Sequence, residues 1–321
     1  MVENRKLQVT GGSTYIVSLP GRWVRENGME KGSSVSISEE FNILKIRPEN
    51  YVEKEVARTI ELSERYSEGL LNRILISSYI AGFDSLKINT RSYISNEQRD
   101  IVRKFTRVAM GVELLEETAN SITLQNVLDS ESFPPVNALK RMIINVQAMI
   151  NDTVIALEIK DNALLENIIS RDDEVDRYHF YMMKETLGNT GKKNDEMFNM
   201  LHSRILERIA DHTVNICNTL QKGERMEKEQ IDGLKGFLEF CSELFQKSAA
   251  LYFNVNLFEV NDLVSKKEMI KERKEMLSKI KGKNISSSTI TEEISRIGMY
   301  STDIAELTLD AYTFKNVSMK I

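Results

Sequence analysis

Proline and cysteine are both scarce in this chain of 321 residues. Its four prolines all lie at or before position 135, so nothing interrupts helices in the remaining sequence. The two cysteines, Cys217 and Cys241, stand among apolar residues with helical spacing. We expect both to be buried thiols, which fits a reducing cytoplasm and argues against a disulfide scaffold.

Long apolar runs are also missing. No run approaches the roughly 18 residues of a membrane span, and the start, MVENRKLQV, lacks the apolar core of a signal peptide. The net charge of −5 gives no global nucleic-acid signature. We therefore expect a soluble, cytoplasmic, mainly helical protein, long enough for two or three domains.

Residues 1–50 alternate apolar and polar positions on both sides of Gly11-Gly12, which predicts a β-hairpin. A short helix follows in PGRWVRENG, and a second hairpin in SSVSISEEFNILKIRP. So short a segment rarely folds alone, because it buries too little apolar surface, so we expect residues 1–50 to form a homodimer.

The run GGSTYIVSLPGRWVRENGMEKGSSVSI resembles the SpoVT-AbrB family of swapped-hairpin DNA-binding domains. The resemblance implies an operator as partner, and basic residues near the N-terminus suit phosphate contact. Gly21 stands where the family carries a basic residue after S-L-P, and Arg22 follows it. The alternative is a dimerisation module alone. The candidate DNA-binding residues are Arg5, Lys6, Thr10, Ser13, Arg22 and Arg25.

Residues 51–132 predict a small α+β domain with two helices among four strands. Arg99, Arg103 and Arg107 are spaced to share one face of the second helix. We favour a solvated face paired with Glu97 and Asp100 over a phosphate-binding face. No catalytic pattern stands out here.

Helical periodicity continues almost unbroken through residues 133–321. We predict six helices, near 137–160, 163–188, 196–221, 229–256, 260–281 and 288–316. LERIADHTVNICN at 206–218 is similar to ISRIGMYSTDIAE at 294–306. IISRDDEVDR at 168–177 is likewise similar to LVSKKEMIKE at 263–272. The region therefore reads as two three-helix bundles, 133–224 and 225–321, related by duplication.

Two acidic pairs stand out in the first bundle. Asp172 and Asp176 are four residues apart, as are Glu207 and Asp211, so each pair shares a helix face. If the two helices fold back through the GNTGKKND turn, Asp172 lies opposite Asp211 and Asp176 opposite Glu207. A cation would offset the repulsion among four carboxylates. The alternative is a solvated acidic face paired with Arg177, Arg204 and Arg208.

These acidic motifs, together with R-I-G-M-Y-S-T-D-I-A-E, resemble the PhoU family of phosphate-uptake regulators. With an AbrB-like head, the chain is similar to the archaeal form of that family. The resemblance implies that Asp172, Asp176, Glu207 and Asp211 hold metal of the Fe, Zn, Mn or Mg class. Asp152, on the preceding helix, is a further candidate ligand.

The second repeat departs from the acidic pattern. It carries Lys267, Lys271, Ser295 and Met299 at the four matching positions, so we expect no metal there. Asp303 and Glu306 are expected at the surface. His179 and His212, near the acidic residues in sequence, are read as structural.

The resemblances imply a phosphate-responsive regulator that controls transcription of phosphate-uptake genes, or the activity of the phosphate transporter. A transporter ATPase or a sensor kinase is the expected protein partner. One alternative is an adaptor without direct DNA binding. Another is a carboxylate-bridged metalloenzyme, but the chain lacks the Glu-x-x-His motif of di-iron bundles. We therefore do not expect an enzyme.

Overall fold

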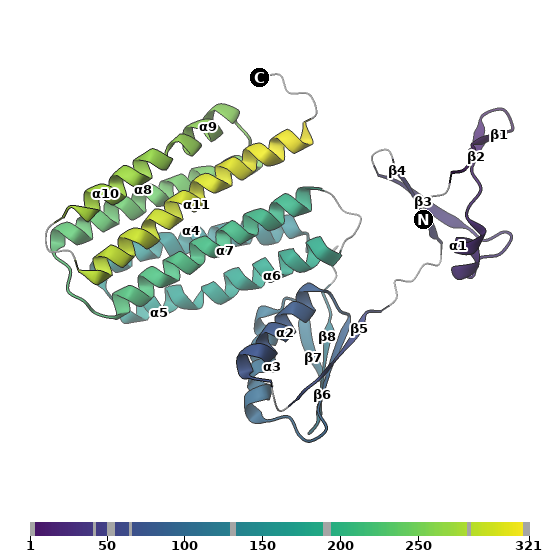
Figure 1. The fold of residues 1–321 in the computed structure, drawn as a ribbon, viewed down its shortest axis with the longest axis horizontal. Coiled ribbons are helices and arrows are strands. Elements are labelled where there is room, and N and C mark those ends of the chain that lie inside the picture. The colour runs from purple at the N-terminus through teal and green to yellow at the C-terminus, as the bar shows by residue number, and fades with distance from the viewer. Residues whose placement is uncertain are drawn as a thin grey trace. The chain divides into compact units, whose positions relative to one another are not determined.

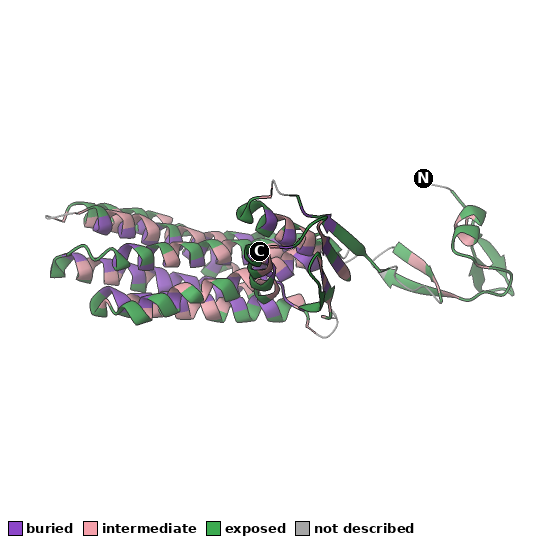
Figure 2. Cartoon of the chain, turned by 90° about the horizontal axis from the view of Figure 1, so that it is seen from below, coloured by how far each residue is buried: buried purple, intermediate pink, exposed green. Residues whose placement is uncertain are grey.

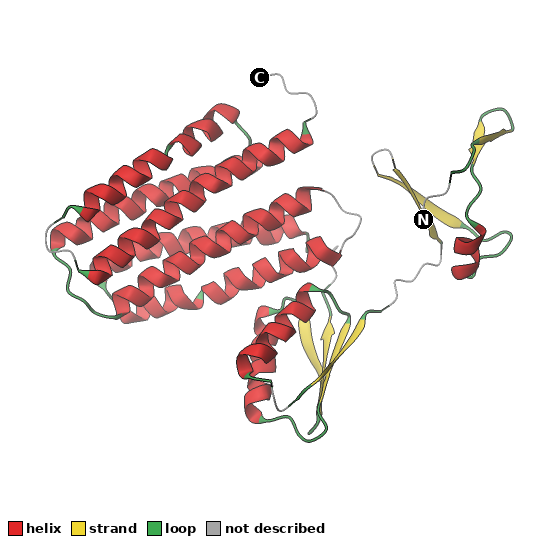
Figure 3. Cartoon of the chain, in the orientation of Figure 1, coloured by secondary structure: helices red, strands yellow, loops and turns green. Residues whose placement is uncertain are grey.

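The computed structural model describes residues 4–40, 43–49, 55–63, 66–128, 133–188, 194–280 and 284–316. The chain divides into two compact units, Met1–Glu55 and Val56–Ile321. The second unit contains a small α+β domain and a helical domain, which pack against each other through α2, α3 and α6. The mainly helical fold with a β-rich N-terminal unit is confirmed (Figure 3).

The N-terminal unit consists of two antiparallel hairpins around a short helix. The first hairpin pairs β1 (Gln8–Thr10) with β2 (Thr14–Ile16), and its turn places Gly11 and Gly12 at positive φ. Helix α1 (Gly21–Glu26) follows, and β3 (Val35–Glu40) then pairs with β4 (Ile43–Pro48). Both predicted hairpins and the helix between them are therefore present.

This N-terminal unit has no core of its own within the described residues: none of those between 4 and 49 is buried (Figure 2). Ile37 and Leu44 on the second hairpin are 61% and 64% exposed, and Val9 and Tyr15 on the first are equally open. Apolar side chains spread over both hairpins are unfavourable in water. They supply a surface that a partner can cover.

The α+β domain is a four-stranded sheet with two helices on one face (Figure 1). Its elements are β5 (Ala57–Glu61), α2 (Glu68–Ile80), β6 (Ser85–Asn89), α3 (Asn96–Val108), β7 (Val112–Glu117) and β8 (Ser121–Asn126). The strand order is β5-β6-β8-β7, with β5 parallel to β6. Leu86, Ile88, Ile122 and Leu124 alternate along the central strands and pack under the helices.

The arginine row on α3 shows only part of the expected pairing. Arg103 pairs with Asp100, as expected, at 3.5 Å. Arg99 instead pairs with Glu117 on β7 and donates to the Thr118 and Ala119 carbonyl oxygens. It ties the helix to the β7–β8 hairpin.

The helical domain is built from two similar halves. The first holds α4 (Pro135–Ile159), α5 (Asn162–Ser170), α6 (Asp172–Gly188) and α7 (Asn194–Gln221). The second holds α8 (Lys228–Phe253), α9 (Leu257–Ser265), α10 (Lys267–Ser278) and α11 (Ile285–Lys315). α4, α6, α7, α8 and α11 pack together around one continuous apolar core.

Two predicted helices are each divided in the structure. The helix expected over 163–188 breaks at Arg171, and the helix expected over 260–281 breaks at Lys266. The serine before each break, Ser170 or Ser265, donates its hydroxyl to the carbonyl three residues earlier. Such bonds compete with the helical ladder and bend it, so the same deviation recurs in both halves.

Helix α4 is long and apolar enough by composition to cross a membrane, and 39% of its most apolar window is buried. Its contacts with α6, α7 and α8 bury one side of the helix in the shared core, while Ile144, Ile155 and Ile159 remain exposed. Both cysteines are buried free thiols, as predicted.

Helix α6 attaches the α+β domain to the helical domain. Phe180 packs on the core beneath α2 and α3, and the Lys184 ammonium lies 5.5 Å from the centre of the Tyr79 ring. The Tyr79 hydroxyl donates to the Met110 carbonyl oxygen at 2.9 Å. The acidic residues at the start of α6 and this contact near its end therefore lie on one rigid helix.

Candidate functional site

The α6–α7 hairpin has the register that brings the acidic pairs together. The His179 ring donates through Nδ1 to the Ser203 hydroxyl at 3.0 Å, since that hydroxyl itself donates to the Met200 carbonyl. Further along, the Thr186 hydroxyl reaches the Glu196 carbonyl oxygen at 3.3 Å. These pairings lie within one residue of the register predicted from the acidic spacing. Asp172 and Asp176 therefore face Glu207 and Asp211.

We call these four residues the acidic quartet. Burial raises the pKa of Asp176 to about 7, and the neighbouring charges of Asp172, Glu207 and Asp211 add to the shift. Burial, followed by the charges of Asp211 and Glu207, likewise raises the pKa of Asp172 to about 6. The pKa of Glu207 is raised by burial and by Asp211, while Arg204 and Arg208 oppose the shift. Protons or a cation would relieve this repulsion.

The side chains of the quartet are incompletely paired. Asp172 Oδ1 and Glu207 Oε2 are buried oxygens without a hydrogen-bond partner among the described residues. Of the arginines considered as neutralising partners, Arg204 reaches the quartet, at 2.9 Å from Glu207 Oε1. Arg177 pairs instead with Glu174, and Arg208 donates to the Tyr300 hydroxyl. The alternative of a solvated, arginine-paired face therefore describes Glu207, which is paired, and Asp211, which is exposed, but not the half-buried Asp172 and Asp176.

These observations test how well the quartet fits a metal. Orphaned buried oxygens and hard carboxylate donors suit a divalent cation. Within the described ranges, however, no group of three or more His, Cys, Asp or Glu side chains is already in ligating position. The carboxylate oxygens of the quartet therefore suit a divalent cation chemically, but their side chains would have to move closer together to bind it.

Asp152 makes a different contact from the quartet. Its carboxylate forms an ion pair with Arg171 at 2.6 Å, and Arg171 also donates to the Asn167 side-chain oxygen. Arg171 occupies the break between α5 and α6. As a metal ligand, Asp152 would first have to release this arginine.

The second half replaces the acidic cluster with an internal ion pair. Lys267, which matches Asp172, lies 2.7 Å from Glu306 and 3.4 Å from Asp303. Asp303 and Glu306, expected merely at the surface, are thus the partners of this lysine. These partners lie further along α11 than Ser295 and Met299, the residues that match Glu207 and Asp211.

The histidines near the quartet are engaged elsewhere. Burial, and secondarily the charge of Arg204, lowers the pKa of His179 to about 4, so it is a neutral hydrogen-bond donor. His212 Nδ1 lies 2.5 Å from Glu293 Oε2, and its ring stacks on Tyr300 of α11. Both fit the structural reading. The pairing with Glu293 joins the two halves and had no signal in the local sequence.

The candidate DNA-binding residues are all exposed on the N-terminal unit. Arg5 and Lys6 precede β1, Thr10 ends that strand, and Ser13 lies in the glycine turn. Arg22 and Arg25 lie on α1, where the Arg22 guanidinium pairs with Glu26 at 2.7 Å. A phosphate at Arg22 would compete with this surface carboxylate.

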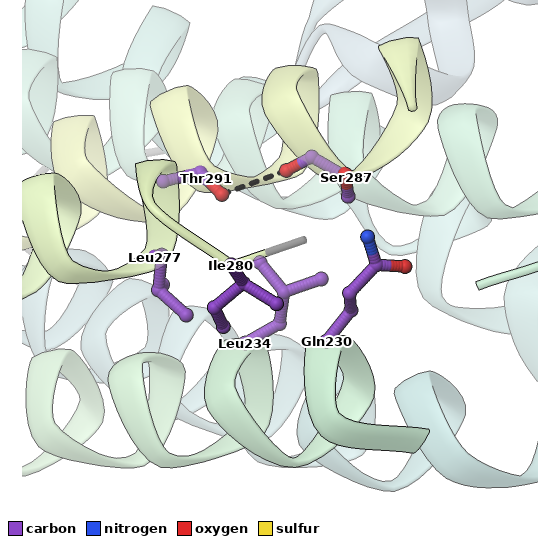
Figure 4. Close-up of a pocket in the computed structure, with 6 residues that line it drawn as sticks. All are labelled: Gln230, Leu234, Leu277, Ile280, Ser287 and Thr291. Atoms are coloured by element: carbon purple, nitrogen blue, oxygen red, sulfur yellow. Dashed lines mark hydrogen bonds between the residues drawn. The ribbon is translucent and has the colours of Figure 1, made fainter. Parts of the chain in front are cut away.

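The helical domain also contains a small cavity between α8, α10 and α11, lined by Gln230, Leu234, Leu277, Ser287 and Thr291, with Ile280 beside them (Figure 4). Its volume is about 10 Å³, which is room for one water molecule. Thr291 and Ser287 already bond each other there. It offers no space for an organic ligand.

The helical domain is a duplicated helical bundle, and the same chain carries a β-rich N-terminal unit. Residues 139–220 match the family model of the PhoU domain, and this stretch includes the whole acidic quartet. Residues 8–62 match the model described as antidote-toxin recognition MazE, bacterial antitoxin. The chain thus joins an AbrB-like N-terminal domain to a PhoU domain, and both resemblances in the sequence are confirmed.

A solved structure supports the fold of the helical part. It is the phosphate transport system regulatory protein PhoU from Streptococcus pneumoniae, at a TM-score of 0.51 and 18% sequence identity. The alignment covers 59% of this chain and 98% of that protein. Comparison with curated proteins gave no match.

Proposed function

We propose that this chain is a phosphate-responsive regulator that binds DNA through its N-terminal unit and a metal ion through its acidic quartet. The observation that carries the proposal is the presence in one chain of a PhoU domain match and an AbrB-like domain match. The known PhoU protein with the similar fold belongs to a phosphate transport system. We assign the chain no reaction of its own.

DNA binding is supported by the charge and exposure of the N-terminal unit. Four basic residues, Arg5, Lys6, Arg22 and Arg25, stand against Glu3 alone in its first 25 positions. A dimer formed over the exposed apolar faces would present two such groups to the phosphate backbone. The operators we propose control phosphate-uptake genes, and the partners in the cytoplasm are the transporter ATPase or a sensor kinase.

Metal binding is supported by the raised pKa values and the orphaned oxygens of the quartet. Asp172, Asp176, Glu207 and Asp211 would supply the oxygen donors, and Asp152 could join them after releasing Arg171. A bound divalent cation would supply charge neutralisation across the hairpin. Helix α6 also packs on the α+β domain. A metal-induced shift of the first turn of α6 would therefore be transmitted to that domain.

The DNA arm of the proposal is tested by fluorescence anisotropy with a labelled random-sequence duplex. We expect affinity that falls as salt rises, and a log–log slope reduced by about one when Arg22→Ala removes one phosphate contact. Glu26→Ala is the matched control, because it frees the Arg22 guanidinium and should strengthen binding. No binding at low salt would favour the adaptor alternative.

The metal arm is tested separately by native mass spectrometry of the full chain with Mn²⁺, Fe²⁺ or Zn²⁺ supplied. We expect one centre per chain, lost in Asp211→Asn and retained in Asp303→Asn, which alters the corresponding region of the second half. Metal retained after Asp176 and Asp211 are both changed to Asn would contradict this assignment. Metal-dependent turnover of a substrate would favour the metalloenzyme alternative.

A further inference from the structure

The four-stranded sheet of the α+β domain has two unlike edges. At one edge, β7 contains a bulge between Leu114 and Glu116 and carries Glu113, Glu116 and Glu117. Bulges and like charges are common ways to prevent an edge strand from pairing. At the other edge, β5 pairs regularly with β6 over its whole length and shows no bulge. The β5 edge therefore lacks the bulge that interrupts β7.

The backbone of β5 alternates between its neighbour and the free edge. The Leu62 N–H donates to the Asn89 carbonyl of β6 at 2.7 Å, and the Val56 carbonyl accepts from the Asp84 N–H on the same side. Even-numbered residues thus bond toward β6. In a parallel ladder the odd-numbered residues, Ala57, Thr59 and Glu61, direct their N–H and C=O groups outward. Within the described part of the chain, no other strand pairs with them.

A groove lies between β5 and helix α2. Its volume is about 400 Å³, and its lining includes Arg58 of β5 and Leu70, Arg73, Ile74 and Ser77 of α2. Leu70 is 40% exposed, and Ile74 is partly exposed one turn further along. An open strand edge beside a helix with apolar side chains is the arrangement in which proteins bind an extended peptide as an added strand.

The charge of the groove is positive. Arg58 donates to the carbonyl oxygens of Ala81 and Gly82 at the end of α2, so its guanidinium is held in place. Arg73 is exposed, and among the described residues it forms no ion pair or hydrogen bond. Among the described residues, no acidic side chain lines the groove. An occupant with carboxylates beside its apolar side chains would complement both features.

Other occupants fit less well. Two copies of β5 paired antiparallel would bring the Arg58 and Arg73 groups of both chains together, and like charges at an interface oppose binding. A nucleic acid would gain one uncommitted arginine but leave Leu70, Ile74 and the outward backbone groups unused. A peptide with acidic and apolar residues uses all three.

We propose that the β5–α2 groove binds an extended acidic segment of a partner protein, which adds to the sheet as a fifth strand beside β5. The outward backbone groups of Thr59 and Glu61 pair with the segment. Its apolar side chains pack on Leu70 and Ile74, and a carboxylate pairs with Arg73. This site lies outside the acidic quartet and the DNA-binding residues, and it gives the α+β domain a role of its own.

The test uses the full chain and a labelled, terminally blocked peptide of alternating valine and glutamate, with a valine–lysine peptide as the charge control. Anisotropy should detect the glutamate peptide. Arg73→Glu should weaken its binding about tenfold or more, the effect of losing one charge-assisted hydrogen bond. Arg107→Glu removes an exposed arginine of the same domain outside the groove, and it should change the affinity by less than about twofold.

Two further measurements locate the peptide. Hydrogen exchange should slow at Thr59 and Glu61 when the glutamate peptide binds. Thr59→Pro removes an outward N–H that bonds to no neighbouring strand, and it should abolish peptide binding while circular dichroism stays unchanged. If that variant unfolds, Arg73→Glu and the exchange data still decide the matter.

Several results would overturn the proposal. The first is that the glutamate peptide does not bind. The second is that Arg73→Glu and Arg107→Glu reduce the affinity for the peptide equally, because the attraction would then be a non-specific effect of charge. In the absence of peptide, hydrogen exchange at the β5 edge that slows as the protein concentration rises would mean that a second copy of the chain occupies the edge. If Arg73→Glu lowered the affinity for duplex DNA but left the affinity for the peptide unchanged, the groove would instead be a site for the phosphate groups of DNA.

Discussion

Asp176 shows how a single residue can make stability depend on both pH and metal. Its pKa is raised to about 7 in the folded chain, against an ordinary value of 3.8. The folded protein therefore binds this proton more tightly than the unfolded chain does. Stability is greatest below the unfolded value and falls as pH rises from about 4 to about 7. Above that range, the ionised quartet opposes the fold unless a cation is present.

We predict that metal-free protein in chelator melts at a lower temperature at pH 8 than at pH 5, and that Asp176→Asn flattens this dependence. The variant has one ionisable carboxylate fewer in the repulsive group, so less stability is lost on deprotonation. Differential scanning calorimetry at several pH values measures the effect. Glu174→Gln is the control, since Glu174 lies in the same first turn but pairs with Arg177 outside the quartet. Identical slopes for wild type and Asp176→Asn would contradict the assigned coupling.

Asp211→Asn should have opposite effects with and without metal. With Mn²⁺ supplied, the melting temperature should fall because a donor is lost. In chelator, the variant should be neutral or slightly more stable, because repulsion with Asp172 and Glu207 is removed. A destabilisation of equal size in both conditions would mean that Asp211 serves packing alone.

At the scale of elements, the second half depends on how closely α11 approaches α8 and α10. Gly298 lies at this contact: a Cβ there would stand 2.8 Å from Cys241 Sγ and 3.1 Å from Ile270 Cδ1. Both neighbours are fully buried, so neither can move freely. The glycine therefore allows the helices to pack at this distance.

We predict that Gly298→Ala destabilises the chain by about 1–3 kcal/mol through overpacking. Gly236→Ala on α8 is the matched control, because a Cβ there meets nothing within 4 Å. That change should instead stabilise by about 0.5–1 kcal/mol, since alanine loses less backbone entropy in a helix. Urea unfolding curves of both variants give the comparison. Equal effects of the two substitutions would rule out the close approach of the helices at Gly298.

At the scale of the whole molecule, the N-terminal unit is the part through which we expect the chain to assemble. Its described residues form strands and a helix but bury no side chain, so it gains little stability from its own core. Burial of its apolar faces against a second copy would supply what is missing. The PhoU-like helical domain, by contrast, has a large continuous core within one chain.

We predict that the full chain is a dimer and that Leu44→Lys shifts it toward monomer. Leu44 is directly opposite Glu39 in the β3–β4 hairpin, so a lysine there would form a cross-strand ion pair and preserve the hairpin. It would oppose burial at the interface. Leu115→Lys, which changes an equally exposed leucine of the α+β domain, is the control. Sedimentation showing a wild-type monomer at micromolar concentration would contradict the prediction.

The sequence by itself determined most of the local structure and the register, but not the helix breaks at Arg171 and Lys266. Helical periodicity, the alternation around Gly11-Gly12 and the duplication depend on backbone geometry and on residues close together in the chain. These can be read from a single sequence. The spacing of Asp172, Asp176, Glu207 and Asp211 likewise determined which residues face each other once the α6–α7 hairpin formed. These features need no information about distant contacts.

Tertiary structure decided everything that depends on burial and on partners from other elements. It paired Asp152 with Arg171 and gave Lys267 the carboxylates of Asp303 and Glu306. It also left Asp172 Oδ1 without a donor among the described residues. Within the part of the chain that the structure describes, no strand pairs with the outer edge of β5. The physical reason is that desolvation and ion pairing depend on distances between segments far apart in the chain, which periodicity alone does not encode.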